Sequence, residues 1–268
     1  MTSIVNTIAG QHQQTIQALF PDIPISNDPV YYRWLIKNYP SKANLRKMAL
    51  IAETLTYKPL VSVIMPVFNT PERFLRDAIE SVLEQVYPNW ELCIADDAST
   101  EPHVKKILRD YISKYPRIKV TFRGKNGHIS LSSNSAIEIA TGEFIALLDH
   151  DDLLTSDALY EVVLLLNRYP DADMIYSDED YVSDDGKLVT PFFKPDWCPD
   201  SFLSRMYTCH LGIYRHSLIT QIGGFRVGYE GSQDYDLVLR LTEKTEKYIT
   251  YPKFYITGDF IQALLQLH

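Results

Sequence analysis

The chain has 268 residues, of which 46% are hydrophobic and 22% are charged, and its formal net charge is −8. This composition is ordinary for a soluble globular protein, and the acidic charge argues against a nucleic-acid partner. No window holds the roughly 18 apolar residues that a membrane span needs. The three cysteines lack metal-binding spacing, and the N-terminus lacks a basic start with an apolar run, so we expect a cytoplasmic protein without a signal peptide. Peripheral contact with the inner membrane face stays open.

Residues 1–58 differ in pattern from the rest of the chain. Asp28 and Pro29 are typical of a helix start, and they predict a helix that continues to Asn38. A second helix is expected over 43–54. We therefore expect a small helical appendage that serves packing or partner contact rather than chemistry.

Strand and helix patterns alternate over residues 59–252. This alternation predicts an α/β domain with βαβ units, in which a mostly parallel sheet is flanked by helices. The strands are expected at 60–68, 90–95, 118–122, 143–148 and 172–176. The helices are expected at 72–85, 102–115, 132–140 and 157–168, with a further helix from Leu237.

Acidic residues follow the carboxyl ends of these expected strands: Asp96, Asp97, Asp149, Asp151 and Asp178. Ligands of open α/β sheets bind in the crevice beyond those strand ends. A shared position at that edge therefore predicts a ligand site made of carboxylates.

The segment 144–152 is an apolar run that ends in Asp149, His150, Asp151 and Asp152. If the strand ends at Asp149, its carboxylate and that of Asp151 can converge on one divalent cation, and oxygen ligands suit Mg²⁺ or Mn²⁺ beside phosphate oxygens. The alternative is that Asp149 or Asp152 caps the next helix. In the same way, Asp96 or Asp97 either contacts a nucleoside or caps the helix near Pro102.

A glycine-containing loop leads into the last expected helix, where Asp234 and Asp236 lie in the first turn. The helix dipole there favours negative charge, so a carboxylate stays ionised and can act as a base; plain dipole complementation is the alternative.

His210 is either a pocket residue or a core histidine. No Gly-x-Gly-x-x-Gly follows the first strand, which argues against a dinucleotide-binding dehydrogenase.

These motifs, taken together, resemble the family 2 glycosyltransferases of the GT-A fold. The resemblance begins with the segment 61–69 and with Asp96 to Ser99, and it continues through Asn126 and Gly127. The acidic motif 149–152 and the segment 233–236 then come in the order of the family. The segments 32–34 and 57–60 also resemble a bacterial subgroup that builds surface polysaccharides such as O-antigen.

The resemblance implies a role for each matching position. Asp149 and Asp151 would be the metal ligands, and Asp234 would be the catalytic base of an inverting transfer. The nucleotide would contact a larger set, namely Pro66, Phe68, Asn69, Asp97, Asn126, Asn134 and Asp149. His210, Glu230 and Gln233 would lie near the acceptor.

The C-terminal segment departs from the family pattern. Residues 253–268 do not contain the His-Trp-Arg type of segment that commonly reaches the diphosphate or the metal, so we treat them as an atypical tail. The tail is either altered or truncated, or it forms a short amphipathic helix, and it leaves donor affinity and turnover in question.

The sequence therefore predicts an inverting, Mn²⁺- or Mg²⁺-dependent glycosyltransferase of bacterial polysaccharide synthesis. The donor would be a UDP, dTDP or GDP sugar, and the acceptor a glycan or a lipid-linked glycan. One alternative is a nucleotidyltransferase, which also holds Mg²⁺ with acids at strand ends. The other is a non-catalytic sugar-nucleotide-binding scaffold, suggested by the atypical tail.

Overall fold

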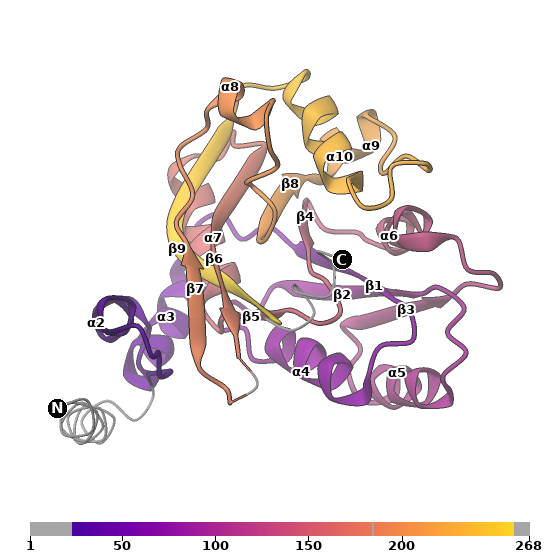
Figure 1. Ribbon diagram of the computed structural model, residues 1–268, viewed down its shortest axis with the longest axis horizontal. Helices are drawn as coiled ribbons and strands as arrows, with labels where there is room; N and C mark the ends of the chain where they lie inside the picture. The colour runs from indigo at the N-terminus through magenta and orange to yellow at the C-terminus, as the bar shows by residue number, and fades with distance from the viewer. Residues whose placement is uncertain (1–22, 184, 260–268) are drawn as a thin grey trace, which may run out of the picture.

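The structure, a computed structural model, describes residues 23–183 and 185–259 and is organised around one mixed sheet (Figure 1). Its strands follow the order β3-β2-β1-β4-β8-β6-β9-β5, and β7 pairs with β6 outside this path. The strands are β1 (Val61–Val67), β2 (Trp90–Asp96), β3 (Ile118–Phe122), β4 (Phe144–Leu147), β5 (Leu153–Leu154), β6 (Met174–Val182), β7 (Leu188–Phe192), β8 (Gly212–Arg215) and β9 (Tyr248–Asp259). The α/β class predicted from the sequence is confirmed.

The first half of the sheet is parallel, and the second half is mixed. Val61 of β1 pairs with Trp90 of β2 on one side and with Phe144 of β4 on the other, both in parallel register. The chain moves outward from β1 to β3 and then returns to place β4 on the opposite side of β1, so the strand order switches between β1 and β4. Open α/β sheets bind ligands beyond the carboxyl ends of strands at such a switch point. Strand β8 is antiparallel to both β4 and β6, so parallel pairing does not extend across the whole sheet.

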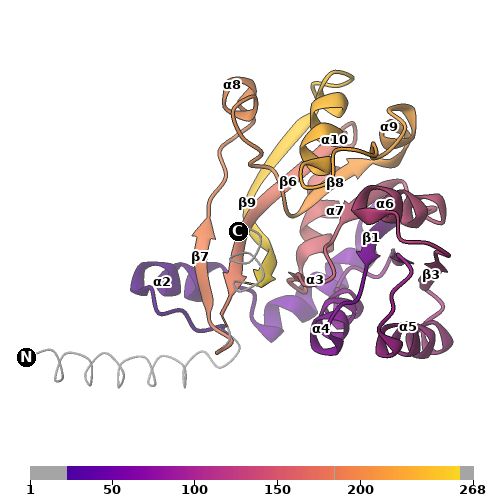
Figure 2. The same ribbon diagram turned by 45° about the vertical axis from the view of Figure 1, so that its right-hand side comes forward.

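Helices cover both faces of the sheet (Figures 1 and 2). Alternate residues of a strand point to opposite faces. Val63 packs in the cluster that includes α4, α5 and α7, whereas Ile64 packs with Ala136 of α6. Because neither face is solvated, the central strands β1 and β2 are buried along their whole length and are mostly apolar. The helices are α2 (Pro29–Asn38), α3 (Lys42–Thr54), α4 (Glu72–Leu83), α5 (Pro102–Lys114), α6 (His128–Glu138), α7 (Ala158–Arg168), α8 (Pro199–Phe202), α9 (His216–Gln221) and α10 (Gln233–Thr242).

The two helices predicted before the first strand are present. The Asp28 carboxylate caps α2 by accepting hydrogen bonds from the N–H groups of Val30 and Tyr31. Helix α2 packs against Leu188 of β7, and Met48 of α3 packs on the main core. The predicted appendage therefore rests on the sheet domain over its described part, and residues 1–22 lie outside the described residues.

Strand β6 is longer than the sequence pattern indicated. The expected strand ended at residue 176, but β6 continues through Asp178, Glu179 and Asp180 to Val182. The placement of Asp178 beyond a strand end was therefore wrong. Its carboxylate is buried within the sheet and accepts a hydrogen bond from the main-chain N–H of Lys194 at 2.7 Å. That bond offsets the cost of removing the carboxylate from water.

The C-terminal part of the described chain pairs at the far side of the sheet. Strand β9 runs parallel to β6 and antiparallel to β5, so part of the atypical tail predicted at 253–268 is strand rather than helix. Residues 260–268 lie outside the described residues. Across residues 23–183 and 185–259, no helix combines the length and the apolar character that a membrane crossing requires.

Candidate active site

A cavity of about 280 Å³ opens at the carboxyl ends of β1 and β2. Pro66 and Phe68 line it from β1 and the turn after it, and Asp97 lines it from the residue after β2. Asn126 and His150 complete the part that faces the strand ends. The remaining lining residues are Val67, His128, Ile129 and Ser132. The structure thus brings together Pro66, Phe68, Asp97 and Asn126, all predicted as nucleotide contacts.

Asp96, the last residue of β2, and Asp97, which follows it, make different contacts. Asp97 is buried, and its carboxylate accepts hydrogen bonds from the Gly127 N–H at 3.0 Å and pairs with the Arg123 guanidinium at 2.7 Å. Asp96 instead orders the turn by accepting from the Ser99 N–H at 3.1 Å. Neither acid caps α5, whose N-cap is Glu101. Asp97 is therefore the acid that faces the cavity.

Two other predicted nucleotide residues are engaged in the framework around the cavity. The Asn69 side chain accepts hydrogen bonds from the N–H groups of Thr100 at 2.8 Å and Glu101 at 3.1 Å. The Asn134 amide bonds both the N–H and the C=O of Phe225 at 2.8 Å, which joins α6 to the loop before α10. Their contact with a nucleotide stays a prediction.

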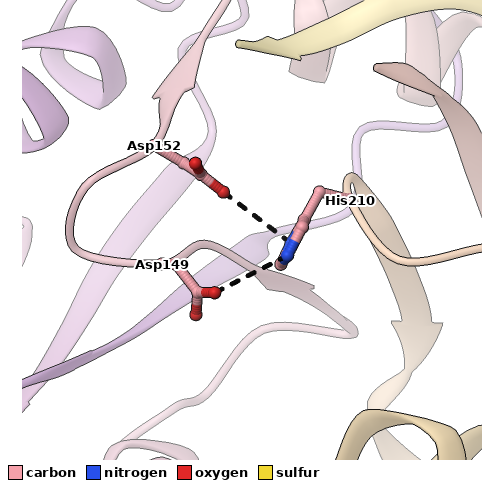
Figure 3. Close-up of side chains that lie close together, drawn as sticks. All are labelled: Asp149, Asp152 and His210. Carbon is pink, nitrogen blue, oxygen red and sulfur yellow. Dashed lines mark ion pairs between the residues drawn. The ribbon is translucent and has the colours of Figure 1, made fainter. Parts of the chain in front are cut away.

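An acidic cluster forms where β4 ends (Figure 3). His210, just before β8, places Nε2 at 3.6 Å from Asp149 Oδ2 and Nδ1 at 3.9 Å from Asp152 Oδ2. One ligand atom from each of the three side chains lies within 4.8 Å of the others. Asp151 is not a member of this group among the described residues, and its predicted role as a metal ligand stays a prediction.

The electrostatics of this cluster favour a bound cation. Burial raises the pKa of Asp152 well above its usual value; His210 opposes this rise, and the carboxylates of Asp149 and Asp151 add to it. Burial likewise raises the pKa of Asp151. Burial lowers the pKa of His210, but the carboxylates of Asp149 and Asp152 outweigh it, so that this pKa rises to about 8.

His210 Nδ1 is buried without a hydrogen-bond partner. Carboxylate oxygens of this kind suit Mg²⁺ or Mn²⁺, and an imidazole nitrogen is a further possible ligand once the ring has lost its extra proton. The residues present therefore fit a divalent ion.

The first turn of α10 holds the predicted base. Burial raises the pKa of Asp234, and it outweighs the opposite effect of the hydrogen bond from the Tyr235 N–H at 2.8 Å. The role of Asp234 as a base stays a prediction, and the half-buried setting acts on its pKa in the direction opposite to the helix dipole. Asp236 is instead paired with Arg240 at 2.8 Å and with Arg226. Burial alone would raise the pKa of Asp236, but the two guanidinium groups outweigh it and hold this pKa below its usual value.

The two acceptor residues predicted near α10 order the loop that precedes it. The exposed Glu230 carboxylate accepts from the Gly228 N–H at 2.9 Å, and the Gln233 side chain accepts from the Gly231 N–H at 2.7 Å. Gly224, at φ +66°, is close to Asn134, and a Cβ there would come within 2.5 Å of its Oδ1. The loop is thus tied to α6, and contact of Glu230 and Gln233 with an acceptor stays a prediction.

The sequence over residues 62–223 matches the family model of glycosyl transferase family 2. The chain belongs to this family. The O-antigen biosynthesis protein RfbC of Myxococcus xanthus is 36% identical over 227 residues, which are 84% of this chain and 18% of RfbC. The family 2 chain spans between 18% and 22% of the length of two curated relatives that it matches.

Solved structures show the same fold. S. aureus TarS in complex with UDP-GlcNAc superposes with a TM-score of 0.63 at 20% identity, over 74% of this family 2 chain and 58% of TarS. The mannosyltransferase PcManGT from Pyrobaculum calidifontis, in complex with GDP-Man and Mn²⁺, gives 0.58 at 20% identity, over 81% of this chain and 66% of that one. The GT-A fold predicted from the sequence is confirmed.

Sequence reasoning did not identify the grouping of Asp152 with His210 in this family 2 domain. The two residues are distant in the chain, and the pattern around His210 shows no metal-ligand spacing. The sequence feature that could have indicated the grouping is the position of His210 shortly before β8, the short strand that pairs with β4.

Proposed function

We propose that this domain is an inverting, metal-dependent glycosyltransferase that moves a sugar from a nucleotide-sugar donor to a hydroxyl of a glycan or lipid-linked glycan. One observation carries the proposal. His150 lines the cavity that holds Asp97, while its neighbour Asp149 belongs to the acidic cluster. A nucleoside in the cavity would therefore extend its diphosphate toward the carboxylates.

The donor site follows from this adjacency. The base and ribose would lie against Pro66, Phe68 and Asp97. Asp149 and Asp151, with Asp152 and His210 beside them, would hold Mn²⁺ or Mg²⁺. The ion, when bound, neutralises diphosphate charge as a Lewis acid and makes the nucleoside diphosphate a better leaving group.

Asp234 would act as the base. Burial raises its pKa toward the working pH, which suits a residue that must accept a proton and still be ionised at the start. The carboxylate removes the proton of the acceptor hydroxyl, and the oxygen attacks the anomeric carbon as the bond to the diphosphate oxygen breaks. Attack opposite the leaving group inverts the anomeric configuration. His210, Glu230 and Gln233 would contact the acceptor.

The comparisons support this class of reaction. TarS binds UDP-GlcNAc and PcManGT binds GDP-Man with Mn²⁺, and RfbC is named for O-antigen biosynthesis. We take UDP as the first candidate nucleotide, with dTDP and GDP next, and bacterial polysaccharide synthesis as the setting. A cytoplasmic site of action, with peripheral contact at the inner membrane face, stays a prediction.

The test is a donor screen with product analysis. Each UDP, dTDP or GDP sugar is incubated with the protein, Mn²⁺ and a mixture of glycan and lipid-linked glycan acceptors, and the released product is identified by chromatography. Nucleoside diphosphate and a sugar product of inverted configuration by NMR are expected. Release of pyrophosphate in a parallel incubation with a nucleoside triphosphate and a sugar 1-phosphate would favour a nucleotidyltransferase, and nucleotide binding without turnover in either incubation would favour the scaffold alternative.

A further inference from the structure

The Lys194 side chain contacts the main chain of His210, a residue of the acidic cluster, and it is fully buried, with 0% of its surface exposed. A lysine ammonium has three N–H donors. Here they are directed at Glu179 Oε2 at 2.9 Å, at the Thr208 carbonyl at 3.1 Å and at the His210 carbonyl. The ammonium is therefore saturated by groups of the protein and has no surface from which to contact a ligand.

Glu179 also binds the main chain of His210. Its Oε2 also accepts the His210 N–H at 3.3 Å. The main chain of His210 is thus bound at its N–H by the carboxylate and at its C=O by the ammonium. The next residue, Leu211, donates its N–H to the Ser177 hydroxyl at 3.3 Å, which continues the attachment to β6.

Stability of the fold is a poor explanation for the buried pair of Lys194 and Glu179. Removing two charges from water costs about as much as their attraction returns, so a buried ion pair is weak support for stability. Its geometric effect is specific, because the residue that it fixes carries the imidazole that lies between Asp149 and Asp152.

We propose that Lys194 and Glu179 are positioning residues that hold the His210 imidazole against the metal-binding carboxylates and so set the affinity of the site for the divalent ion. The expected effect on metal and nucleotide binding depends on the proposed function. The placement of the imidazole itself is independent of that function. Groups that orient metal ligands in this way typically change metal affinity by about 10–100-fold when mutated.

The chain offers a matched control in Glu91. This carboxylate is also buried, pairs with Lys119 at 2.7 Å and accepts a main-chain N–H, that of Thr141, at 2.6 Å. It belongs to β2 near the amino ends of the strands, away from the acidic cluster. Glu91→Gln and Glu179→Gln therefore each remove a buried carboxylate charge that is paired with a lysine, and the pairs differ in that the Lys119 side chain is 36% exposed and that of Lys194 is 0% exposed.

The experiment measures Mn²⁺ affinity and Mn²⁺-dependent UDP affinity by calorimetry, and it records the imidazole NMR signals of the metal-free protein, with His210 assigned from His210→Gln. Glu179→Gln should weaken Mn²⁺ binding at least tenfold and shift the His210 signals, whereas Glu91→Gln should change affinity by less than about twofold and leave those signals in place. Equal effects of the two variants, or unchanged His210 signals in folded Glu179→Gln, would overturn the proposal.

Wild-type protein that binds no nucleotide with Mn²⁺ would refute the proposed function, and the His210 signals would still decide the positioning role. If Glu179→Gln does not fold, Lys194→Arg serves as the second variant. It keeps the charge but replaces the compact ammonium with a planar group, so the same shift of the His210 signals and the same loss of Mn²⁺ affinity are expected.

Discussion

Asp234→Asn should abolish most of the turnover while it stabilises the fold. The amide has nearly the shape of the carboxylate, and its oxygen can still accept the Tyr235 N–H bond seen at 2.8 Å. A general base contributes about 10²–10⁴-fold to the rate, which corresponds to roughly 3–5 kcal/mol of the activation free energy. We therefore expect kcat to fall by about that factor while donor affinity stays close to wild type.

The effect on stability follows from the direction of the pKa shift. Burial raises the pKa of Asp234 above its ordinary value of 3.8, so the folded state binds the proton more tightly than the unfolded state. The contribution of this group to stability is complete below the ordinary pKa and is lost as pH rises through the raised pKa. At pH 7 the carboxylate thus costs stability, and Asp234→Asn should raise the melting temperature there but not at pH 3.

Initial rates of nucleoside diphosphate release, measured from pH 5 to 9, give the activity, and circular dichroism melts at pH 7 and pH 3 give the stability. Wild-type kcat should fall as pH falls through the raised pKa of Asp234, because the base becomes protonated. A variant that keeps more than a tenth of wild-type kcat, or that melts below wild type at pH 7, would refute the assignment of Asp234 as a buried base.

Two further variants separate structure from binding. Asp236→Asn should lower the unfolding free energy by about 2 kcal/mol, because it breaks the 2.8 Å pair with Arg240, whose side chain is only 15% exposed. Urea denaturation measures this loss, and unchanged stability would contradict the structural role of Asp236. Asp97→Ala should weaken nucleotide binding in the presence of Mn²⁺ at least tenfold, since the carboxylate orders Arg123 and Gly127 at the cavity. Full affinity by calorimetry would place the nucleoside elsewhere.

Local rules predicted much of the fold because they act over a few residues. Asp28 before Pro29 predicts the start of α2, and the apolar run 60–68 predicts β1, since capping and burial depend on near neighbours. The length of β6 could not be predicted in the same way. Its acids are accommodated by Lys194, which lies on a later segment, so a local pattern of charge was mistaken for a strand end.

The sequence predicted which residue types form the site better than it predicted which of those residues contact one another. Pro66, Phe68 and Asp97 do line one cavity, because the carboxyl ends of neighbouring parallel strands meet at one edge. The proximity of His210 to Asp149 depends on the antiparallel pairing of β8 with β4, which joins segments far apart in the chain. Pairing of that kind leaves no spacing for a sequence pattern to detect.

The most direct test of the account is calorimetric titration of UDP, dTDP and GDP into the wild-type protein and Asp149→Ala, each with Mn²⁺ and with EDTA. We predict that one nucleotide binds wild type with Mn²⁺, that EDTA removes this binding and that Asp149→Ala lacks it, since Asp149 lies in the cluster that favours a cation. Binding that is equally tight in EDTA, or that survives in Asp149→Ala, would contradict a metal-dependent donor site at the end of β4.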